Sequence, residues 1–134
     1  YSARSAKVEW NIDAEESTLS LIPEMRTDIM LTFPRRTLII DTKYYGQSMQ
    51  EYMDKATIRS NNLYQINSYV LHEDKTHSGN VDGMLLYAKT QEAICPDGQM
   101  KHYDCNIIYF RNLDLNQDFG IIKHQLNSFI GMYL

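Results

Sequence analysis

The chain has 134 residues, 43% of them hydrophobic, and 13 Lys and Arg against 17 Asp and Glu give it a formal net charge of −4. This length fits one domain that can build a core, which excludes a disordered chain, and the acidic balance argues against a protein that binds nucleic acid on its own. No apolar run reaches the ~20 residues of a membrane span and no secretory signal opens the chain, so we expect an intracellular protein.

The first half of the chain is predicted to consist mainly of strands. Alternation of polar and apolar residues, and runs of β-branched and aromatic residues, predict strands over 7–12, 19–22, 26–33 and 37–45. Residues 13–17 form a polar turn, and Pro34-Arg35-Arg36 separates the last two strands. The polar stretch 47–59 has no clean period, and part of it could be helical.

The second half is predicted to contain two helices and two strands. Ser60 or Asn61 is a plausible N-cap for a helix over 62–73, and Leu63, Ile66 and Val70 have the spacing of its core stripe. Strands are expected over 81–89 and 103–111, with a hairpin around Pro96-Asp97-Gly98. The helical spacing of one apolar stripe predicts a C-terminal amphipathic helix that packs on the core: Phe119, Ile122, Leu126, Phe129 and Tyr133.

This order of elements predicts an α/β (α+β) fold in which helices flank a mixed central β-sheet. We find no linker and no internal repeat, so residues 1–134 are expected to form a single domain. Because the chain begins with Tyr1 and not with Met, we expect it to be a fragment of a longer protein.

Three charged residues stand inside otherwise apolar predicted strands: Asp28, Asp41 and Lys43. Side chains alternate along a strand, so Asp41 and Lys43 share one face. Asp28 joins that face only if paired residue numbers sum to an odd value, which requires an even-length loop. Pro34 suits a type I turn in a four-residue loop, 34–37, which predicts Asp28 opposite Lys43.

Two carboxylates and a lysine on one face could form a divalent-metal site. Burial of a lone carboxylate is costly, so an acid within a strand normally has a partner or a metal, and oxygen ligands suit Mg²⁺. Mg²⁺, or Mn²⁺ in its place, would polarise a phosphate and activate water, while Lys43 could orient that water or neutralise developing charge. The alternative is a structural ion pair between Lys43 and one of the two acids.

An acid thirteen residues before an apolar strand that ends in Asp-x-Lys resembles the PD-(D/E)xK nuclease superfamily. More specifically, RTDIMLTF, TLIIDTKYY and SNNLYQINSYVLHE resemble the C-terminal nuclease domain of the McrC family, which implies a restriction-endonuclease-like fold. The resemblance implies metal binding by Asp28, Asp41 and Thr42, and a catalytic role for Lys43. Thr27 stands where the superfamily's name has Pro.

Gln65 and Tyr69 match a Gln-x-x-x-Tyr element found in several nucleases of this superfamily. Residues at i and i+4 share one face of a helix, so both side chains can point toward the site. The resemblance assigns them a supporting part in catalysis, whereas the residues alone are equally compatible with an ordinary polar flank.

The resemblance implies a cytoplasmic prokaryotic protein of a 5-methylcytosine-dependent restriction system. It also implies DNA as the substrate and an AAA+ GTPase subunit of the McrB kind as the partner, which would supply recognition. Two alternatives stay open: a different defence or repair nuclease of the same superfamily, and an inactive scaffold or interaction module with the same fold. Arg35 and Arg36 could contact phosphates or be merely solvated. Cys95 and Cys105 lack the paired spacing of a zinc site, which favours free thiols.

Overall fold

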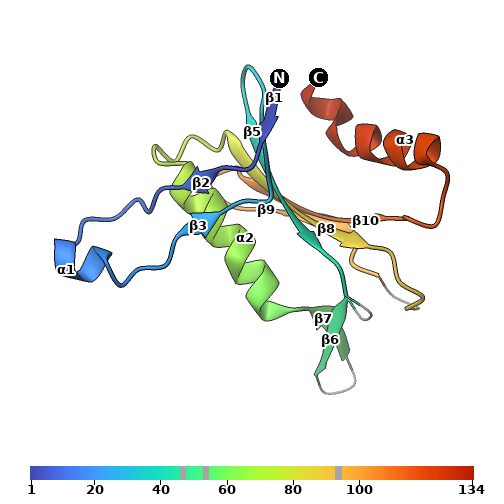
Figure 1. The fold of residues 1–134 in the computed structure, drawn as a ribbon, viewed down its shortest axis with the longest axis horizontal. Coiled ribbons are helices and arrows are strands. Elements are labelled where there is room, and N and C mark those ends of the chain that lie inside the picture. The colour runs from blue at the N-terminus through green and yellow to red at the C-terminus, as the bar shows by residue number, and fades with distance from the viewer. Residues whose placement is uncertain (46–47, 53–54, 93–94) are drawn as a thin grey trace.

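The computed structural model describes residues 1–45, 48–52, 55–92 and 95–134. Among these residues, no helix is long and apolar enough to span a bilayer. Figure 1 shows a central sheet between two long helices, with an arm that carries a short helix projecting from one side.

The sheet runs in the order β1-β4-β5-β8-β10-β9. Its strands are β1 (Ser2–Arg4), β4 (Ile29–Thr32), β5 (Thr37–Lys43), β8 (Val81–Ala88), β9 (Gly98–Lys101) and β10 (Ile107–Leu113). Strands β5, β8 and β10 run parallel to one another, and the outer pairings are antiparallel. The prediction of a mixed central sheet is therefore confirmed, and the parallel strands place their carboxyl ends at one edge.

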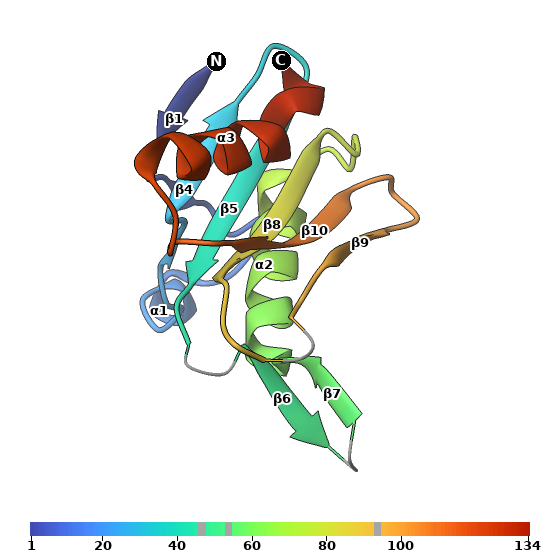
Figure 2. The ribbon, with the colours of Figure 1, turned by 90° about the vertical axis from the view of Figure 1, so that its right-hand side faces the viewer.

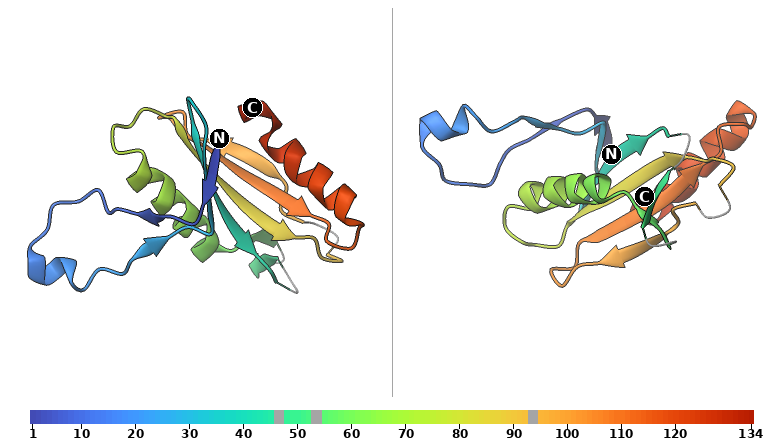
Figure 3. Two further views of the ribbon diagram at one scale, coloured as in Figure 1. Left: turned by 45° about the horizontal axis from the view of Figure 1, so that its top comes forward. Right: turned by 90° about the horizontal axis from the view of Figure 1, so that it is seen from below.

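The helices are α1 (Glu16–Leu19), α2 (Ser60–Glu73) and α3 (Phe119–Ile130), followed by a 3-10 turn, η1 (Gly131–Tyr133). Helices α2 and α3 cover opposite faces of the sheet (Figure 3). Two shorter ladders complete the fold, β2 (Lys7–Val8) with β3 (Met25–Arg26), and β6 (Met49–Tyr52) with β7 (Lys55–Ile58).

The alternation of side chains along β5 divides the core into two layers. Ile39 packs with Ile66 and Val70 of α2, whereas Leu38 and Ile40 face the side covered by α3. All five side chains are buried, and Ile66 and Val70 belong to the stripe predicted from sequence. This alternation also fixes which face of β5 its charged residues, Asp41 and Lys43, occupy, and α2 lies over that face.

The N-terminal third departs from the predicted strands. Only Lys7–Val8 of the predicted strand 7–12 is a strand, α1 and a turn replace the predicted strand over 19–22, and the predicted strand over 26–33 is interrupted before Ile29. The arm around α1 buries none of the helix's residues, so the local alternation there has no sheet to join. Trp10 closes the base of the arm, since its Nε1 donates to the Pro23 carbonyl at 2.7 Å.

Three further predictions, two about strands and one about a helix cap, were wrong. The stretch 47–59 contains the β6–β7 hairpin and no helix in its described part (residues 47, 53 and 54 lie outside the description), and the hairpin extends past the sheet (Figure 2). The predicted hairpin at Pro96-Asp97-Gly98 is instead the start of β9, and the chain reverses between β9 and β10. Helix α2 begins at Ser60 with Arg59 as its N-cap, so neither predicted capping residue holds that position.

Helix α3 forms where predicted but is buried less than expected. Only Ile130 is buried in it, while Phe119 is 80% and Leu126 40% exposed. Its C-terminal end is held by η1, where Tyr133 stacks on Phe33 with ring centroids 5.0 Å apart. The prediction that the whole stripe packs on the core is therefore wrong for its first half.

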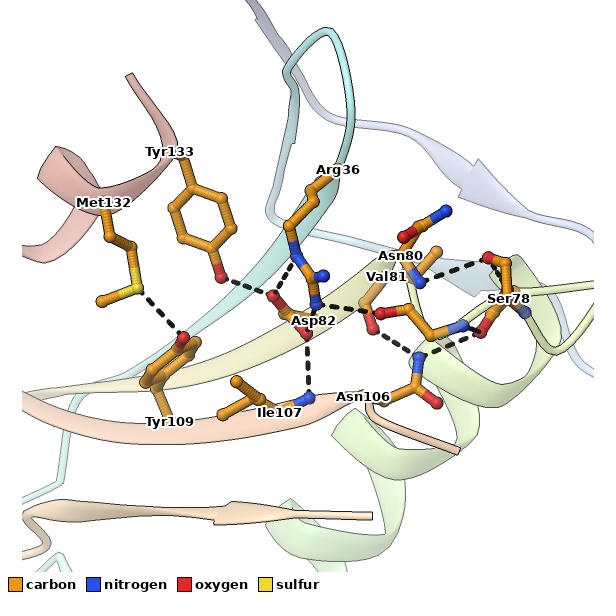
Figure 4. Close-up of polar contacts among 12 residues, drawn as sticks. Arg36, Ser78, Asn80, Val81, Asp82, Asn106, Ile107, Tyr109, Met132 and Tyr133 are labelled. Carbon is orange, nitrogen blue, oxygen red and sulfur yellow. Dashed lines mark hydrogen bonds and ion pairs between the residues drawn. The ribbon is translucent and has the colours of Figure 1, made fainter. Parts of the chain in front are cut away.

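A buried carboxylate fastens this end of the fold. Asp82 is 1% exposed and accepts hydrogen bonds from Arg36 Nη2 at 2.7 Å, the Ile107 amide at 2.8 Å and the Tyr133 hydroxyl at 2.7 Å (Figure 4). Arg36 also donates to the Gly79 carbonyl at 2.9 Å. Arg36 thus serves a structural ion pair at the amino ends of the parallel strands, at the opposite edge from Lys43.

Candidate functional site

The hairpin of β4 and β5 has the predicted parity but a different register. Thr32 pairs with Thr37 and Ile29 with Ile40, so paired numbers sum to 69, which is odd as required. The predicted loop 34–37 would have given a sum of 71. The observed loop begins one residue earlier, because the Phe33 amide donates to the Arg36 carbonyl at 2.8 Å. Continued by one residue, this register brings Asp28 to Asp41, not to Lys43.

Asp41 and Lys43 lie on the α2-facing side of β5, at the carboxyl end of the parallel strands. Their side chains are 5% and 16% exposed, and Lys43 Nζ lies 2.7 Å from Asp41 Oδ2. No hydrogen bond from the described residues reaches Asp41 Oδ2, so the ammonium is its partner. In open α/β sheets, ligands bind outside the carboxyl ends of strands, which is where this pair is placed.

Asp41 is a carboxylate that has lost much of its hydration by burial. Burial raises the pKa of Asp41 above its usual value, contact with Lys43 opposes the rise, and the charge of Asp28 adds to it. Two carboxylates close enough for the charge of Asp28 to raise the pKa of Asp41 favour a cation between them. Lys43 supplies part of that positive charge.

Asp28 precedes β4 and is exposed. Its Oδ2 accepts hydrogen bonds from both the amide and the hydroxyl of Thr42, each at 2.8 Å. Asp28 is therefore held on the residue between Asp41 and Lys43, through one carboxylate oxygen as far as the described residues are concerned. Thr42, which the resemblance implies as a metal-binding residue, contacts Asp28 as a hydrogen-bond donor.

Gln65 contacts Lys43 directly, and Tyr69 contacts Gln65. Gln65 Oε1 accepts a hydrogen bond from Lys43 Nζ at 2.9 Å, and Gln65 Nε2 donates to the Tyr69 hydroxyl at 2.8 Å. The Tyr69 hydroxyl donates in turn to the Arg26 carbonyl at 3.2 Å. The Gln65 amide accepts from Lys43 and donates to Tyr69, so its orientation is fixed by both neighbours. Burial raises the pKa of Tyr69, so it stays protonated as a donor.

Sequence reasoning missed a second polar group on the same side of the sheet. Tyr45 donates through its hydroxyl to Asn62 Oδ1 at 3.1 Å, and Asn62 Nδ2 donates to the Tyr87 hydroxyl at 3.4 Å. Asn62 is 1% and Tyr87 0% exposed. The available signal was the position of Asn62 three residues before Gln65, on the same helix face.

The residues present fit a divalent metal ion. Asp41 offers a buried carboxylate whose Oδ2 lies against the Lys43 ammonium, and Asp28 offers a second carboxylate that is bonded through Oδ2 to Thr42. Mg²⁺ is commonly bound by one or two carboxylates together with waters and substrate phosphate oxygens, so two acids suffice. No group of three or more His, Cys, Asp or Glu side chains gathers around such a position within the described ranges. Both cysteines are free thiols.

Comparisons with known proteins agree with the resemblance seen in the motifs. The chain is 26% identical over 128 residues to the type IV methyl-directed restriction enzyme EcoKMcrBC of Escherichia coli (strain K12), which covers 95% of this chain. It spans about a third, 36%, of the length of that relative. The similarity to McrC is thereby confirmed. No family model matches the chain.

A solved structure shares the fold. It is the half-complex from a tetradecameric assembly of Thermococcus gammatolerans McrB AAA+ hexamers with bound McrC, and it matches with a TM-score of 0.57 at 12% identity. The match covers 96% of this chain and 28% of that one. This likeness concerns the fold, and it agrees with the restriction-endonuclease-like architecture expected from sequence.

Proposed function

We propose that this chain is a Mg²⁺-dependent DNA endonuclease domain of a restriction system directed at modified DNA, with 5-methylcytosine as the modification. The observation that carries the proposal is the convergence of Asp28, Asp41 and Lys43 at the carboxyl end of β5. The similarity to a methyl-directed restriction enzyme supports it.

In this proposal Asp28 and Asp41 hold the metal ion, with Thr42 beside them. The ion, when bound, neutralises phosphate charge and lowers the pKa of water. Reaction joins a water oxygen to phosphorus and breaks one phosphorus–oxygen ester bond; the attacking water releases a proton to solvent, and the departing oxygen takes one up from solvent. Thr42 keeps Asp28 in place through two hydrogen bonds, so that this acid does not swing into solvent.

Lys43 is the residue proposed to act on the phosphate itself. Its ammonium either orients the attacking water or stabilises the negative charge that grows on the phosphate oxygens. Gln65 and Tyr69 hold the ammonium in one direction, and a preoriented charge needs no reorganisation during the reaction. In this proposal the Gln-x-x-x-Tyr element orients the Lys43 ammonium.

The acidic charge of the chain suits a protein that relies on a partner subunit for DNA recognition. A net charge of −4 gives little non-specific attraction to DNA. We propose an AAA+ GTPase of the McrB kind as the subunit that recognises DNA, because the structural relative is an assembly of McrB AAA+ hexamers with bound McrC. The nuclease domain then needs to hold DNA only near its metal site.

Cleavage of methylated and unmethylated plasmid DNA tests the proposal, with Mg²⁺ or Mn²⁺ and with or without an McrB-type partner and GTP. The wild-type protein should cut methylated DNA, and Asp41→Asn and Lys43→Met should each lower the rate by at least about 100-fold. Asp13→Asn, an exposed acid on the α1 arm, is the matched control and should leave the rate unchanged.

The outcomes separate the alternatives. Cleavage that ignores methylation and needs no partner would indicate a different nuclease of the superfamily. Absence of cleavage under every condition, with Asp41→Asn altering only the thermal stability, would indicate a scaffold in which Asp41 and Lys43 form a structural ion pair.

A further inference from the structure

Helix α2 presents one polar row to the end of β5, and this row has three members, not two. Asn62, Gln65 and Tyr69 follow at i, i+3 and i+7, which places them on one face of the helix. Their partners are, in the same order, the Tyr45 hydroxyl, the Lys43 ammonium and the Arg26 carbonyl. The Gln-x-x-x-Tyr element covers only the last two members.

Asn62 ties α2 to both strands that flank the site. Tyr45 follows Lys43 by two residues in the chain, and Tyr87 of β8 is the direct register partner of Lys43. Asn62 accepts a hydrogen bond from Tyr45 at 3.1 Å and donates one to Tyr87 at 3.4 Å. A single amide therefore contacts a neighbour of Lys43 along the chain and its neighbour across the sheet.

Packing alone does not require an amide at this position. Asn62 is 1% exposed, and a buried amide must find hydrogen bonds to compensate for its lost hydration. A neutral hydrogen bond contributes little net stability, no more than an apolar side chain gains by burial. The amide instead provides directional contacts, because its two hydrogen bonds set the position of α2 relative to the end of β5.

We propose that Asn62 is a positioning residue for the hydrolysis proposed above. It holds the first turn of α2 against Tyr45 and Tyr87, so that Gln65, one turn later, meets the Lys43 ammonium at 2.9 Å. Loss of either hydroxyl contact lets the helix end shift, and Lys43 then loses its fixed direction. This inference rests on the proposed function and adds one residue to its machinery.

The test uses variants that remove the hydrogen bonds of Asn62, either one at a time or together. Tyr45→Phe and Tyr87→Phe each delete one contact of Asn62, and Asn62→Ala deletes both. Tyr64→Phe is the matched control, since Tyr64 lies on the same helix but is 70% exposed. Because the two Phe variants leave no large cavity, they carry the test even if Asn62→Ala fails to fold.

Two measurements are made on each variant: the NMR resonance of the Gln65 side-chain amide, and single-turnover DNA cleavage alongside the Kd for DNA. We expect Tyr45→Phe, Tyr87→Phe and Asn62→Ala each to shift the Gln65 resonance and to lower the cleavage rate by about 10- to 100-fold, with the Kd changed less than about twofold. Tyr64→Phe should match the wild type in both.

An unshifted Gln65 resonance in folded Tyr45→Phe and Tyr87→Phe would overturn the inference, as would a rate loss that only follows the unfolded fraction. If the wild-type protein cuts no DNA at all, the proposed function fails on its own. The Gln65 resonance then still decides whether Asn62 positions the Lys43 contact.

Discussion

Lys43 Nζ lies 2.7 Å from Asp41 Oδ2, because the two residues are two positions apart on the same nearly buried face of one strand. Burial raises the pKa of Asp41 even with the lysine in contact, so the ammonium does not fully compensate the lost hydration of the carboxylate. A buried pair of this kind contributes little to stability on balance. The desolvation cost of the pair is explained if the two charges bind a ligand.

Metal binding should therefore show in the thermal stability. At tenfold the Kd, Mn²⁺ that binds only the folded protein adds ~1.4 kcal/mol, which raises the Tm by about 4–6 °C for a domain of this size. Asp41→Asn and Asp28→Asn should each abolish this shift, as scanning calorimetry with and without Mn²⁺ can measure. An equal shift in Asp41→Asn would place the metal elsewhere.

The site was predictable in outline because it depends on local alternation. Asp41 and Lys43 share a face by the geometry of a strand, and the odd pairing sum has the predicted parity, with Asp28 just before the paired residues and bonded to Thr42. The exact register was not predictable, since it depends on a single turn contact between Phe33 and Arg36. A shift of two residues preserves the face and changes only the partner.

Other features were beyond reach because their causes are long-range. Met25–Arg26 pairs with Lys7–Val8 and not with its neighbour in sequence, and the isolated acid Asp82 gave no hint of its partner Arg36, 46 residues away. Asn62 looked like the start of a helix and no more. Its part emerges only when Tyr45 and Tyr87 are brought to it from two strands.

The close contact of α2 with β8 should be sensitive to a single methyl group. A Cβ on Gly83 would lie 2.7 Å from Ile66 Cγ1 and 2.9 Å from Val70 Cγ2. Gly83→Ala should therefore destabilise the fold by about 1–3 kcal/mol, measured by urea unfolding. In Gly120→Ala, the control, the new methyl has no described atom within 4 Å, and helix α3 should gain about 0.5–1 kcal/mol. Equal effects of the two would contradict the packing argument.

The C-terminal turn should loosen when its hydroxyl contact is removed. Tyr133→Phe deletes the 2.7 Å hydrogen bond to Asp82 but keeps the ring that stacks on Phe33. The free energy of unfolding should fall by about 1–2 kcal/mol, because a buried carboxylate loses one of its donors. Hydrogen exchange should rise first in η1 and α3. Tyr103→Phe, at a fully exposed tyrosine, should change neither quantity.

The acid limb of the stability curve should depend on Asp74, which closes the loop after α2. Burial opposes ionisation of this carboxyl, but hydrogen bonds from Asn106, Ser78 and the Gly79 amide outweigh it, and the pKa of Asp74 is lowered. A carboxyl with a lowered pKa in the folded state stabilises the protein above the unfolded value of about 3.9, and this stabilisation disappears as pH falls through the folded value.

Asp74→Asn should consequently cost about 1–3 kcal/mol at pH 7, where the ionised carboxylate accepts all of these donors. The difference from the wild type should shrink as pH falls below about 4, since the wild-type carboxyl then takes up a proton. Urea unfolding between pH 7 and pH 3 measures the difference, with Asp13→Asn as the control for an exposed acid. A difference that stays constant across this range would show that the contacts of Asp74 do not favour its charged form, and the loop would then owe its order to Asn106 and its contact with the Val81 carbonyl.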